Sequence, residues 1–554
     1  MNLLKTYFPP VVDSSGAVSW RLTVHNAIYF LLLFVLIGAQ PVSNFMMSGM
    51  EILLAVNWAL EWDMRAKWNR ARNCPLLWAF LVLMGVHLVW MIGTENVAYG
   101  WNDIFKKLPL LAIPLVVLTS RPLGRKRLTW LLFTFVSTVF VATVIGRIRI
   151  ATIPDLPYRQ IIPFISHIRF SMNVCLAIVV IAWFGVERAK RLEGASSGGR
   201  KARRPYADWL LWLMLLVTVS LIDFLFKLRS YTAFVMLFVT AVLLLVVFWR
   251  RIGNKFVAFM AMSAALLVVA VTLLVSVGMY NDYYTPIPLA NEPLRPLTAN
   301  GNSYQHKQDG LIENGNYVNN YICRSELERE WAKRSSVGLD DTTDNEYTVY
   351  PTLLRYLNAI GATKDSVGVS LLGDDDVRAI EKGIANPVYV NGSSLRKMYY
   401  VMFFEYECYR NFGAVKDFTM LQRFELWKNA WCTFCKHPVA GVGTGDVVDE
   451  CHRELAVRQS PLQGTYKHAH NQYITFLVSF GIVGFCIICC FFVYAFRRQS
   501  LLRIPVVLAF VSIVLISFIT EDTLETLAGC VFSTLFICLM AAGEAESGER
   551  RTEM

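Results

Sequence analysis

The sequence predicts an all-α polytopic membrane protein, with about 12 transmembrane helices and one large, mainly helical loop between helices 9 and 10. Three observations predict this fold. Of the 554 residues, 55% are hydrophobic and only 17% are charged, whereas about a quarter of a soluble domain is charged. The apolar residues form blocks about 20 residues long, the length of a helix that crosses a bilayer. Basic loops also alternate with loops that lack Lys and Arg. A soluble enzyme, a disulfide-stapled secreted domain and a disordered chain are therefore excluded.

The apolar blocks define the expected spans and the domain organisation. Spans are expected near residues 24–40, 46–60, 76–93, 104–119, 129–146, 170–187, 208–226, 231–249, 256–279, 472–495, 504–519 and 526–543. The fourth contains Pro109 and Pro114, and eleven spans remain an alternative, although proline is tolerated in membrane helices. The chain thus divides into nine spans (1–279), a loop domain (280–471), three further spans (472–543) and a tail (544–554).

Basic residues predict the orientation of these spans. Loops 61–75, 120–128, 188–207, 250–255 and 496–503 are rich in Lys and Arg, whereas loops 41–45, 94–103 and 520–525 contain neither. The positive-inside rule places the basic loops and both termini in the cytoplasm and the large loop outside. Two outer segments break this pattern, because loop 147–169 contains four arginines and turn 227–230 contains Lys227 and Arg229. Outward cations at the membrane surface indicate an anionic ligand there.

The net charge of +11 does not indicate nucleic acid. Residues 281–470 carry 20 basic and 24 acidic side chains, so the basic excess lies in the membrane region. Within this large loop, the stretch to about Asn345 looks irregular, and helices are expected at 350–361, 396–412 and 423–437. The pair Cys432 and Cys435 continues the last of these helices, which argues against a thioredoxin-like site. The run Asp374–Asp376 is expected to begin a helix or form a solvated turn, with no metal site.

The end of the large loop carries the most specific motif. His437–Pro438 leads into Gly441, Gly443 and Gly445, and a later His470–Asn471 is followed by nine residues, Gly481, two residues and Gly484. This pattern resembles the O-antigen ligase/polymerase superfamily of bacterial envelope glycosyltransferases. The turn at 227–234 resembles the arginine turn of that family, and residues 166–171 resemble an upstream arginine segment. The resemblance covers roughly residues 160–490.

The resemblance implies a reaction at the periplasmic face of the bacterial inner membrane. A glycan is transferred from undecaprenyl pyrophosphate to a sugar hydroxyl, without metal or other cofactor. The acceptor is lipid A–core in ligases of lipopolysaccharide biosynthesis and another repeat unit in polymerases. We favour a ligase because the histidine pattern is typical of ligases. A polymerase and a protein O-oligosaccharyltransferase are the alternatives within the family, and a flippase or transporter is the alternative of another class. The donor sugar and the oligomeric state stay open.

Residue chemistry supports specific roles. Arginine binds phosphate through two parallel hydrogen bonds and stays charged, so Arg229 and Arg169 are expected to hold the pyrophosphate. For Arg229, a pair with Asp223 or snorkelling is the structural alternative. Neutral imidazole accepts a proton near neutral pH, which makes His470 the expected general base of an inverting transfer. Further substrate contacts are expected from Asn471, His468, Arg423, Gly443 and Gly445. A tight turn is the alternative for the glycine run from Gly441 to Gly445, structural packing is the alternative for Arg423, and a supporting position is the alternative for His468.

Overall fold

The chain forms two compact units in the computed structural model. The structure describes residues 10–12, 18–154, 156–196, 208–252, 255–285, 294–308, 310–344, 347–416, 419–464 and 468–552. The first unit comprises Met1–Met262, Leu426–Arg458 and Tyr466–Met554, and the second comprises Ser263–Glu425 and Gln459–Thr465. The end of the predicted loop domain, including the histidine motif, thus belongs to the unit that contains most of the membrane helices.

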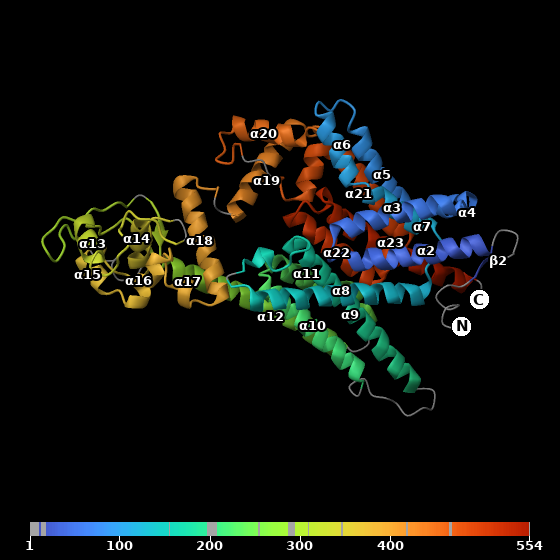
Figure 1. Ribbon diagram of the computed structural model, residues 1–554, viewed down its shortest axis with the longest axis horizontal. Helices are drawn as coiled ribbons and strands as arrows, with labels where there is room; N and C mark the ends of the chain where they lie inside the picture. Colours follow the sequence, from blue (N-terminus) through green and yellow to red (C-terminus); the bar gives the residue numbers. More distant parts are fainter. Residues whose placement is uncertain are drawn as a thin grey trace. The chain divides into compact units, whose positions relative to one another are not determined.

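The first unit is a helical bundle (Figure 1). Its N-terminal part comprises strands β1 (Val11–Val12) and β2 (Val18–Ser19), helices α2 (Trp20–Ala39), α3 (Asn44–Glu61), α4 (Met64–Arg72), α5 (Pro75–Val89), α6 (Val97–Lys106), α7 (Pro109–Thr119), α8 (Gly124–Thr152), the short η1 (Tyr158–Gln160), α9 (His167–Ser196), α10 (Trp209–Lys227), α11 (Tyr231–Phe248) and η3 (Trp249–Arg251). Its C-terminal part comprises α20 (Val447–Val457), α21 (Gln472–Arg498), η5 (Leu501–Arg503), α22 (Pro505–Thr520), η6 (Thr523–Glu525) and α23 (Leu527–Thr552). Helices α12 (Lys255–Tyr284) and α19 (Thr419–Lys436) contribute residues to both units.

Seven helices among the described residues are long and apolar enough to cross a membrane, namely α2, α8, α9, α10, α11, α12 and α21. The pair α4 and α5, bent by 88°, would make an eighth span, and α22 and the apolar part of α23 are shorter. Every predicted range falls on helical structure, but the count of 12 spans is not confirmed. The range 104–119, in which the sequence contains Pro109 and Pro114, is divided between two helices: α6 ends at Lys106, and Pro109, which lacks an N–H, begins α7.

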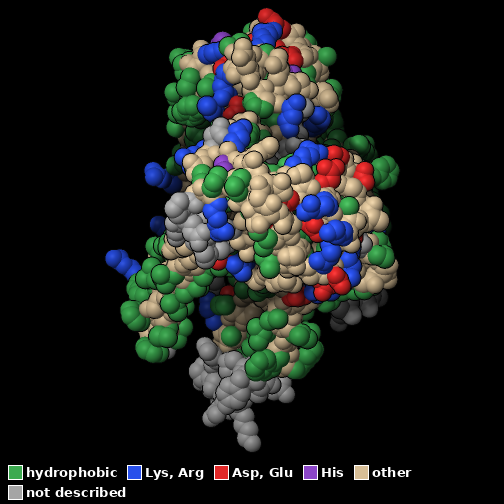
Figure 2. Space-filling view, turned by 90° about the vertical axis from the view of Figure 1, so that its left-hand side faces the viewer, with side chains coloured by type: hydrophobic (Ala, Val, Ile, Leu, Met, Phe, Trp, Pro, Cys, Tyr) green, Lys and Arg blue, Asp and Glu red, His purple; other side chains and the backbone are tan. Residues whose placement is uncertain are grey.

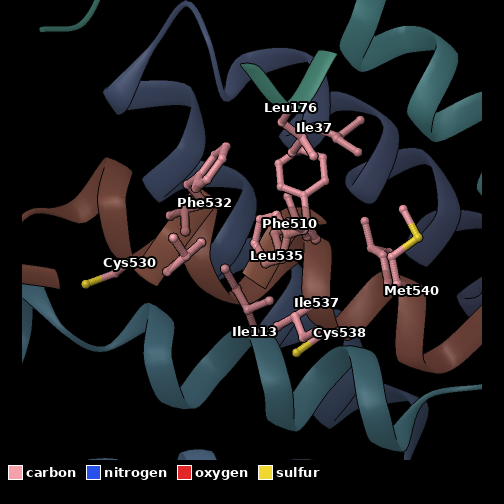
Figure 3. Close-up of a cluster of buried hydrophobic side chains, with 14 of the residues drawn as sticks. Ile37, Ile113, Leu176, Phe510, Cys530, Phe532, Leu535, Ile537, Cys538 and Met540 are labelled. Carbon is pink, nitrogen blue, oxygen red and sulfur yellow. The ribbon is translucent and has the colours of Figure 1, made fainter. Parts of the chain in front are cut away.

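The core of the first unit surrounds α23. Figure 3 shows Phe532 and Leu535 of α23 among Phe510 of α22, Ile37 of α2 and Leu176 of α9. These side chains are almost fully buried. Because α23 lies at the centre of the bundle, its cysteines act as small apolar residues. All twelve cysteines of the chain are free thiols.

The second unit is built from short helices around its own core. Its elements are β3 (Ile312–Glu313), β4 (Asn316–Tyr317), α13 (Arg324–Trp331), α14 (Val349–Ala359), α15 (Ser366–Ser370), α16 (Asp374–Glu381), α17 (Val388–Asn391) and α18 (Ser394–Phe412). The expected helices at 350–361, 396–412 and 423–437 are confirmed as α14, α18 and α19. The expectation of irregular structure up to Asn345 is wrong for α13 and for the hairpin of β3 and β4. Leu327 and Trp331 of α13 are buried in the core, and this burial stabilises a helix that its polar sequence conceals.

Basic and acidic side chains are interspersed on the face of the molecule shown in Figure 2. Exposed ion pairs of the second unit include Arg324 with Asp340 and Arg378 with Asp375. Asp374–Asp376 begins α16, as predicted, and Cys432 and Cys435 lie within α19. Such a mixed surface fits the absence of a nucleic-acid signal in the composition.

Candidate functional site

Helix α21 contains a break at the glycine of the sequence motif. Gly481 has a φ of 62° and a ψ of −170°, which are not helical. At this point the amides of Ile482 and Val483 leave the helix and donate to the carbonyls of Pro438 and Val439, at 2.9 and 3.1 Å. In return, the carbonyls of Val478 and Ser479 accept hydrogen bonds from residues 442 and 443, at 2.9 and 3.0 Å. The irregular segment 438–443, which begins with a turn, thereby satisfies the backbone groups that the break sets free, as an apolar environment requires.

The glycines of the motif allow this close approach. A Cβ atom on Gly481 would overlap the carbonyl of Val439, and one on Gly441 would overlap the backbone at Val478 and Ser479. A Cβ atom on Gly484 would overlap the side chain of Phe480, one turn earlier in α21. The spacing between the motif glycines therefore has a structural reason: the helix must break, and a second chain segment must fit against the break.

This arrangement also bears on the expected role of the glycine loop. The amides of Gly441 and Gly443 donate to the carbonyls of His437 and Ser479, and Gly445 fits tightly against Thr94 and Asn96. The loop is joined to the chain after α5 because Asp446 accepts hydrogen bonds from the amides of residues 95 and 96, at 2.9 and 2.8 Å. These contacts give the glycines a packing role, and substrate binding by Gly441, Gly443 and Gly445 stays a prediction.

His470 lies at the start of α21 and is held by its backbone. Its φ is 53°, in the left-handed region, and its amide donates to Asp522 Oδ2 at 2.7 Å. The next amide, of Asn471, donates to Asp522 Oδ1 at 3.1 Å, and Thr475 Oγ1 donates to the same oxygen at 2.7 Å. The Asn471 side chain caps α21 by accepting from the amide of Ile474. One carboxylate thus fixes the whole turn that carries the histidine.

The imidazole of His470 remains accessible. Its side chain is 33% exposed, and its Nδ1 lies 3.7 Å from Glu521 Oε2. A carboxylate at this distance can orient the ring and stabilise the imidazolium that forms when the histidine accepts a proton. Burial and the neighbouring Glu525 raise the pKa of Asp522, while Thr475 and the two nearby histidines, His468 and His470, act against this shift. The turn therefore combines an exposed base with buried acidic support.

Arg169, which precedes the acidic loop (residues 521–526) by more than 300 residues in the chain, is hydrogen-bonded to the end of that loop. It lies in the first turn of α9, and its Nε donates to Thr526 Oγ1 at 2.8 Å while Nη1 donates to Ser166 Oγ at 3.0 Å. Among the described residues no carboxylate lies within 4 Å of its guanidinium. His470 and Arg169 are therefore both attached to residues 522–526, although neither hydrogen bond could be read from sequence spacing.

Arg229 ends α10 at a position that glycine usually occupies. Its φ is 50°, its amide donates to Phe226 O at 3.0 Å, and the next amide, of Ser230, donates to Leu225 O at 3.2 Å. These two bonds define a Schellman C-cap. The exposed guanidinium lies over the ring of Tyr158, 5.8 Å from its centroid, and this ring contacts His167 of α9 edge-on. The ring of Tyr158 therefore contacts both Arg229 and the first residue of α9.

The predicted alternative partner of Arg229 is occupied by other cations. Asp223 accepts from Arg147 at 2.5 Å and lies 3.6 Å from Lys227, the pair expected from the helical spacing. Arg147 is another of the arginines that break the topology pattern, so its charge is explained by an ion pair. Among the described residues Arg229 has no carboxylate within 4 Å, which leaves its guanidinium directed to Tyr158 alone.

The remaining predicted residues are distributed over both units. His468 and Asn471 lie with His470 in the first unit, where His468 lines a small cavity with Asn429 and Cys451. Arg423 lies on the part of α19 that belongs to the second unit, and its role stays a prediction. Sequence reasoning missed Asp522, Glu521, Thr526 and Tyr158. A signal for the first two existed, because loop 520–525 contains three acidic residues and no basic one.

Comparison with known families identifies the same part of the chain. The family described as O-antigen ligase matches residues 384–489. The match includes α18, α19, the glycine loop, His470 and the break at Gly481. It supports membership of the O-antigen ligase superfamily, as the resemblance predicted, and it supports an enzyme at family level. No curated protein matches the chain. The apolar helices and the family match together indicate a multi-pass membrane protein.

Proposed function

We propose that this member of the O-antigen ligase superfamily is a ligase-type glycosyltransferase of the bacterial inner membrane. It transfers a glycan from undecaprenyl pyrophosphate to a hydroxyl of lipid A–core at the periplasmic face. One observation carries the proposal: a partly exposed histidine, and an arginine with no carboxylate within 4 Å among the described residues, are both held by one short loop, through Asp522 and Thr526. A base and a phosphate-binding cation fixed together are what a metal-independent transfer of this kind requires.

The proposed reaction is a single inverting displacement. The acceptor oxygen forms a bond to the anomeric carbon while the bond from that carbon to the pyrophosphate oxygen breaks, and its electron pair goes to the leaving oxygen. His470 takes the hydroxyl proton, as a general base with accessible ring nitrogen does. Arg169 and Arg229 stabilise the negative charge that develops on the pyrophosphate, since guanidinium forks bind phosphate bidentately. No metal and no other cofactor are needed in this scheme.

An apolar cavity beside the site supports a lipid-linked donor. It has a volume of about 170 Å³ and is lined by residues of α5, α7, α21, α22 and α23, among them Tyr473, Phe476, Phe518 and Leu524. Tyr473 follows His470 by three residues, and Leu524 lies within the acidic loop. A polyprenyl chain whose pyrophosphate lies at the site could therefore enter apolar surroundings directly. The lining suits an aliphatic chain because almost all of it is hydrophobic.

Reconstitution with a defined donor tests the function. The purified protein is placed in liposomes with an undecaprenyl-pyrophosphate-linked glycan and offered lipid A–core, a second repeat unit and an acceptor protein. Glycosylation of lipid A–core is expected, and His470→Ala abolishes it, whereas His437→Ala, which changes an exposed histidine of the same region, does not. Transfer to a repeat unit or a protein would instead assign a polymerase or an oligosaccharyltransferase. Movement of the glycan across the membrane without transfer would contradict the enzyme proposal.

A further inference from the structure

A buried cluster of three charged side chains includes Glu525 of the acidic loop, residues 521–526. Lys107 Nζ, at the end of α6, donates to Asp103 Oδ2 at 2.5 Å and to Glu525 Oε2 at 2.7 Å. The side chains are 4%, 8% and 8% exposed. The two carboxylates belong to different parts of the chain, because Asp103 lies on α6 whereas Glu525 lies in the loop before α23. Lys107 is therefore the link between α6 and this loop.

Gln472 connects the cluster to the turn of His470. Its Nε2 donates to Glu525 Oε1 at 3.0 Å, and its Oε1 accepts from the amide of Leu524 at 2.8 Å. Gln472 is the first residue of α21 and stands two positions after His470, and it is fully buried. The chain of contacts from Lys107 through Glu525 and Gln472 thus ends at the same loop that holds His470 by Asp522 and Arg169 by Thr526.

Electrostatics make Lys107 essential to this arrangement. Although burial favours its neutral form, Lys107 lowers the pKa of Glu525 below its ordinary value, and burial together with Glu525 raises the pKa of Asp103 to about 7. A buried ion pair adds little net stability compared with an apolar replacement, but removal of one partner leaves a buried charge uncompensated. Without Lys107, Glu525 would have to bind a proton or leave its place, and either change alters its bond with Gln472.

We propose that Lys107 is a positioning residue that sets the geometry of the catalytic loop through Glu525 and Gln472. This inference rests on the proposed function where it concerns transfer. It differs from that function in assigning a role to a buried cation that touches no substrate. Loop 521–526 is then bound to Lys107 through Glu525, and it binds His470 through Asp522 and Arg169 through Thr526. Loss of the cation would loosen both groups together.

A second buried ion pair in the same unit provides a matched control. Lys67 of α4 lies 2.9 Å from Glu61, with side chains 3% and 8% exposed, and it does not contact the acidic loop. Lys107→Met and Lys67→Met each remove one buried cation, and the two side chains are 4% and 3% exposed. Lys107→Arg keeps the charge, and the double change Lys107→Met/Glu525→Gln removes one of the two carboxylates that Lys107→Met leaves without their cation.

Two readouts test the proposal in the full-length protein in lipid nanodiscs. Lys107→Met should accelerate amide hydrogen exchange in residues 468–472 and 521–526 at least tenfold, and it should lower kcat for glycan transfer at least tenfold, whereas Lys67→Met does neither. Lys107→Arg and the double variant should each recover part of both losses. Exchange rates and kcat in Lys107→Met that equal those of Lys67→Met would overturn the inference. If the wild-type protein shows no transfer, the proposed function fails, and the exchange comparison alone decides the role of Lys107.

Discussion

Gly481 offers the most direct test of the structural account of the motif. Alanine at this position has to adopt a φ near 62°, and its methyl group would overlap the Val439 carbonyl. With a ψ of −170°, this conformation is adopted almost only by glycine and costs another residue about 1–3 kcal/mol. If the overlap displaces segment 438–443 and two of the four hydrogen bonds across the break are lost, each contributes about 1 kcal/mol more. Gly481→Ala should therefore lower the free energy of unfolding by about 3–5 kcal/mol.

Gly49 is the matched control for this substitution. It lies inside α3 with an ordinary helical φ, and no heavy atom lies within 4 Å of an added Cβ. Gly49→Ala should leave stability unchanged or raise it by about 0.5–1 kcal/mol, because alanine favours helix over glycine. Unfolding in mixed detergent micelles, followed by tryptophan fluorescence, measures both variants. A Gly481→Ala protein whose stability lies within about 1 kcal/mol of the wild type, no more than the smallest backbone penalty by itself, would refute the account of the break.

Three further predictions follow from single contacts. Arg229→Gly should raise the free energy of unfolding by about 1 kcal/mol, since glycine is favoured at the left-handed cap, and it should abolish glycan transfer. Arg229→Lys keeps the charge but loses the forked guanidinium, and full transfer activity in that variant would contradict the bidentate role. Asp522→Asn should lower kcat at least tenfold because an amide nitrogen faces one of the two backbone amides of residues 470 and 471; unchanged kcat would remove Asp522 from the site. Burial lowers the pKa of Lys364 to about 7 from its ordinary value of 10.5, so the unfolded chain binds more protons than the folded chain between these pH values, and the stability of the second unit should rise as the pH increases from about 7 to about 10.5. Lys364→Met should flatten this rise, as measured by hydrogen exchange of α14. An identical slope in both proteins would contradict the prediction.

The membrane helices could be predicted because their signal is local. Each apolar block is long enough to favour a helix by itself, so every predicted range overlaps helical structure, although 104–119 is divided between two helices. The errors arise where another effect is stronger than hydropathy. Pro109 divides one apolar block into α6 and α7, and α3 carries Glu51 and Glu61 as buried residues that lower its hydropathy. In the second unit, α13 depends on the burial of Leu327 and Trp331, and tertiary burial is not visible in a polar segment.

The candidate site was predictable in its proposed chemical groups but not in its connections. A histidine beside a span and two outward arginines are conspicuous in a sequence with few charges. The residues that hold them are distant in the chain: Asp522 follows His470 by 52 residues, and Thr526 follows Arg169 by 357. Side-chain spacing along one helix carries no information about such contacts. The glycine motif was recognised as a pattern, but only the fold explains it as a break filled by a second segment.

Backbone conformation adds an argument about which of these residues matter for function. Among the described residues, seven other than glycine have a positive φ, and Arg229 and His470 are two of them. A positive φ alone does not mark a site, because Trp62 and Ser500 also adopt it at helix ends.

The four positions differ in the chemistry of the side chain that glycine would replace. Trp62 and Ser500 could be replaced by glycine with a gain of about 1 kcal/mol and no loss of a charged group. At Arg229 and His470 the same replacement would remove a guanidinium with no carboxylate within 4 Å among the described residues and a partly exposed imidazole. Strain of this kind persists where the surrounding contacts impose it: Asp522 imposes it on His470, and the Schellman bonds impose it on Arg229. That the chain retains these two side chains against their backbone preference favours a role in binding or chemistry over a role in packing.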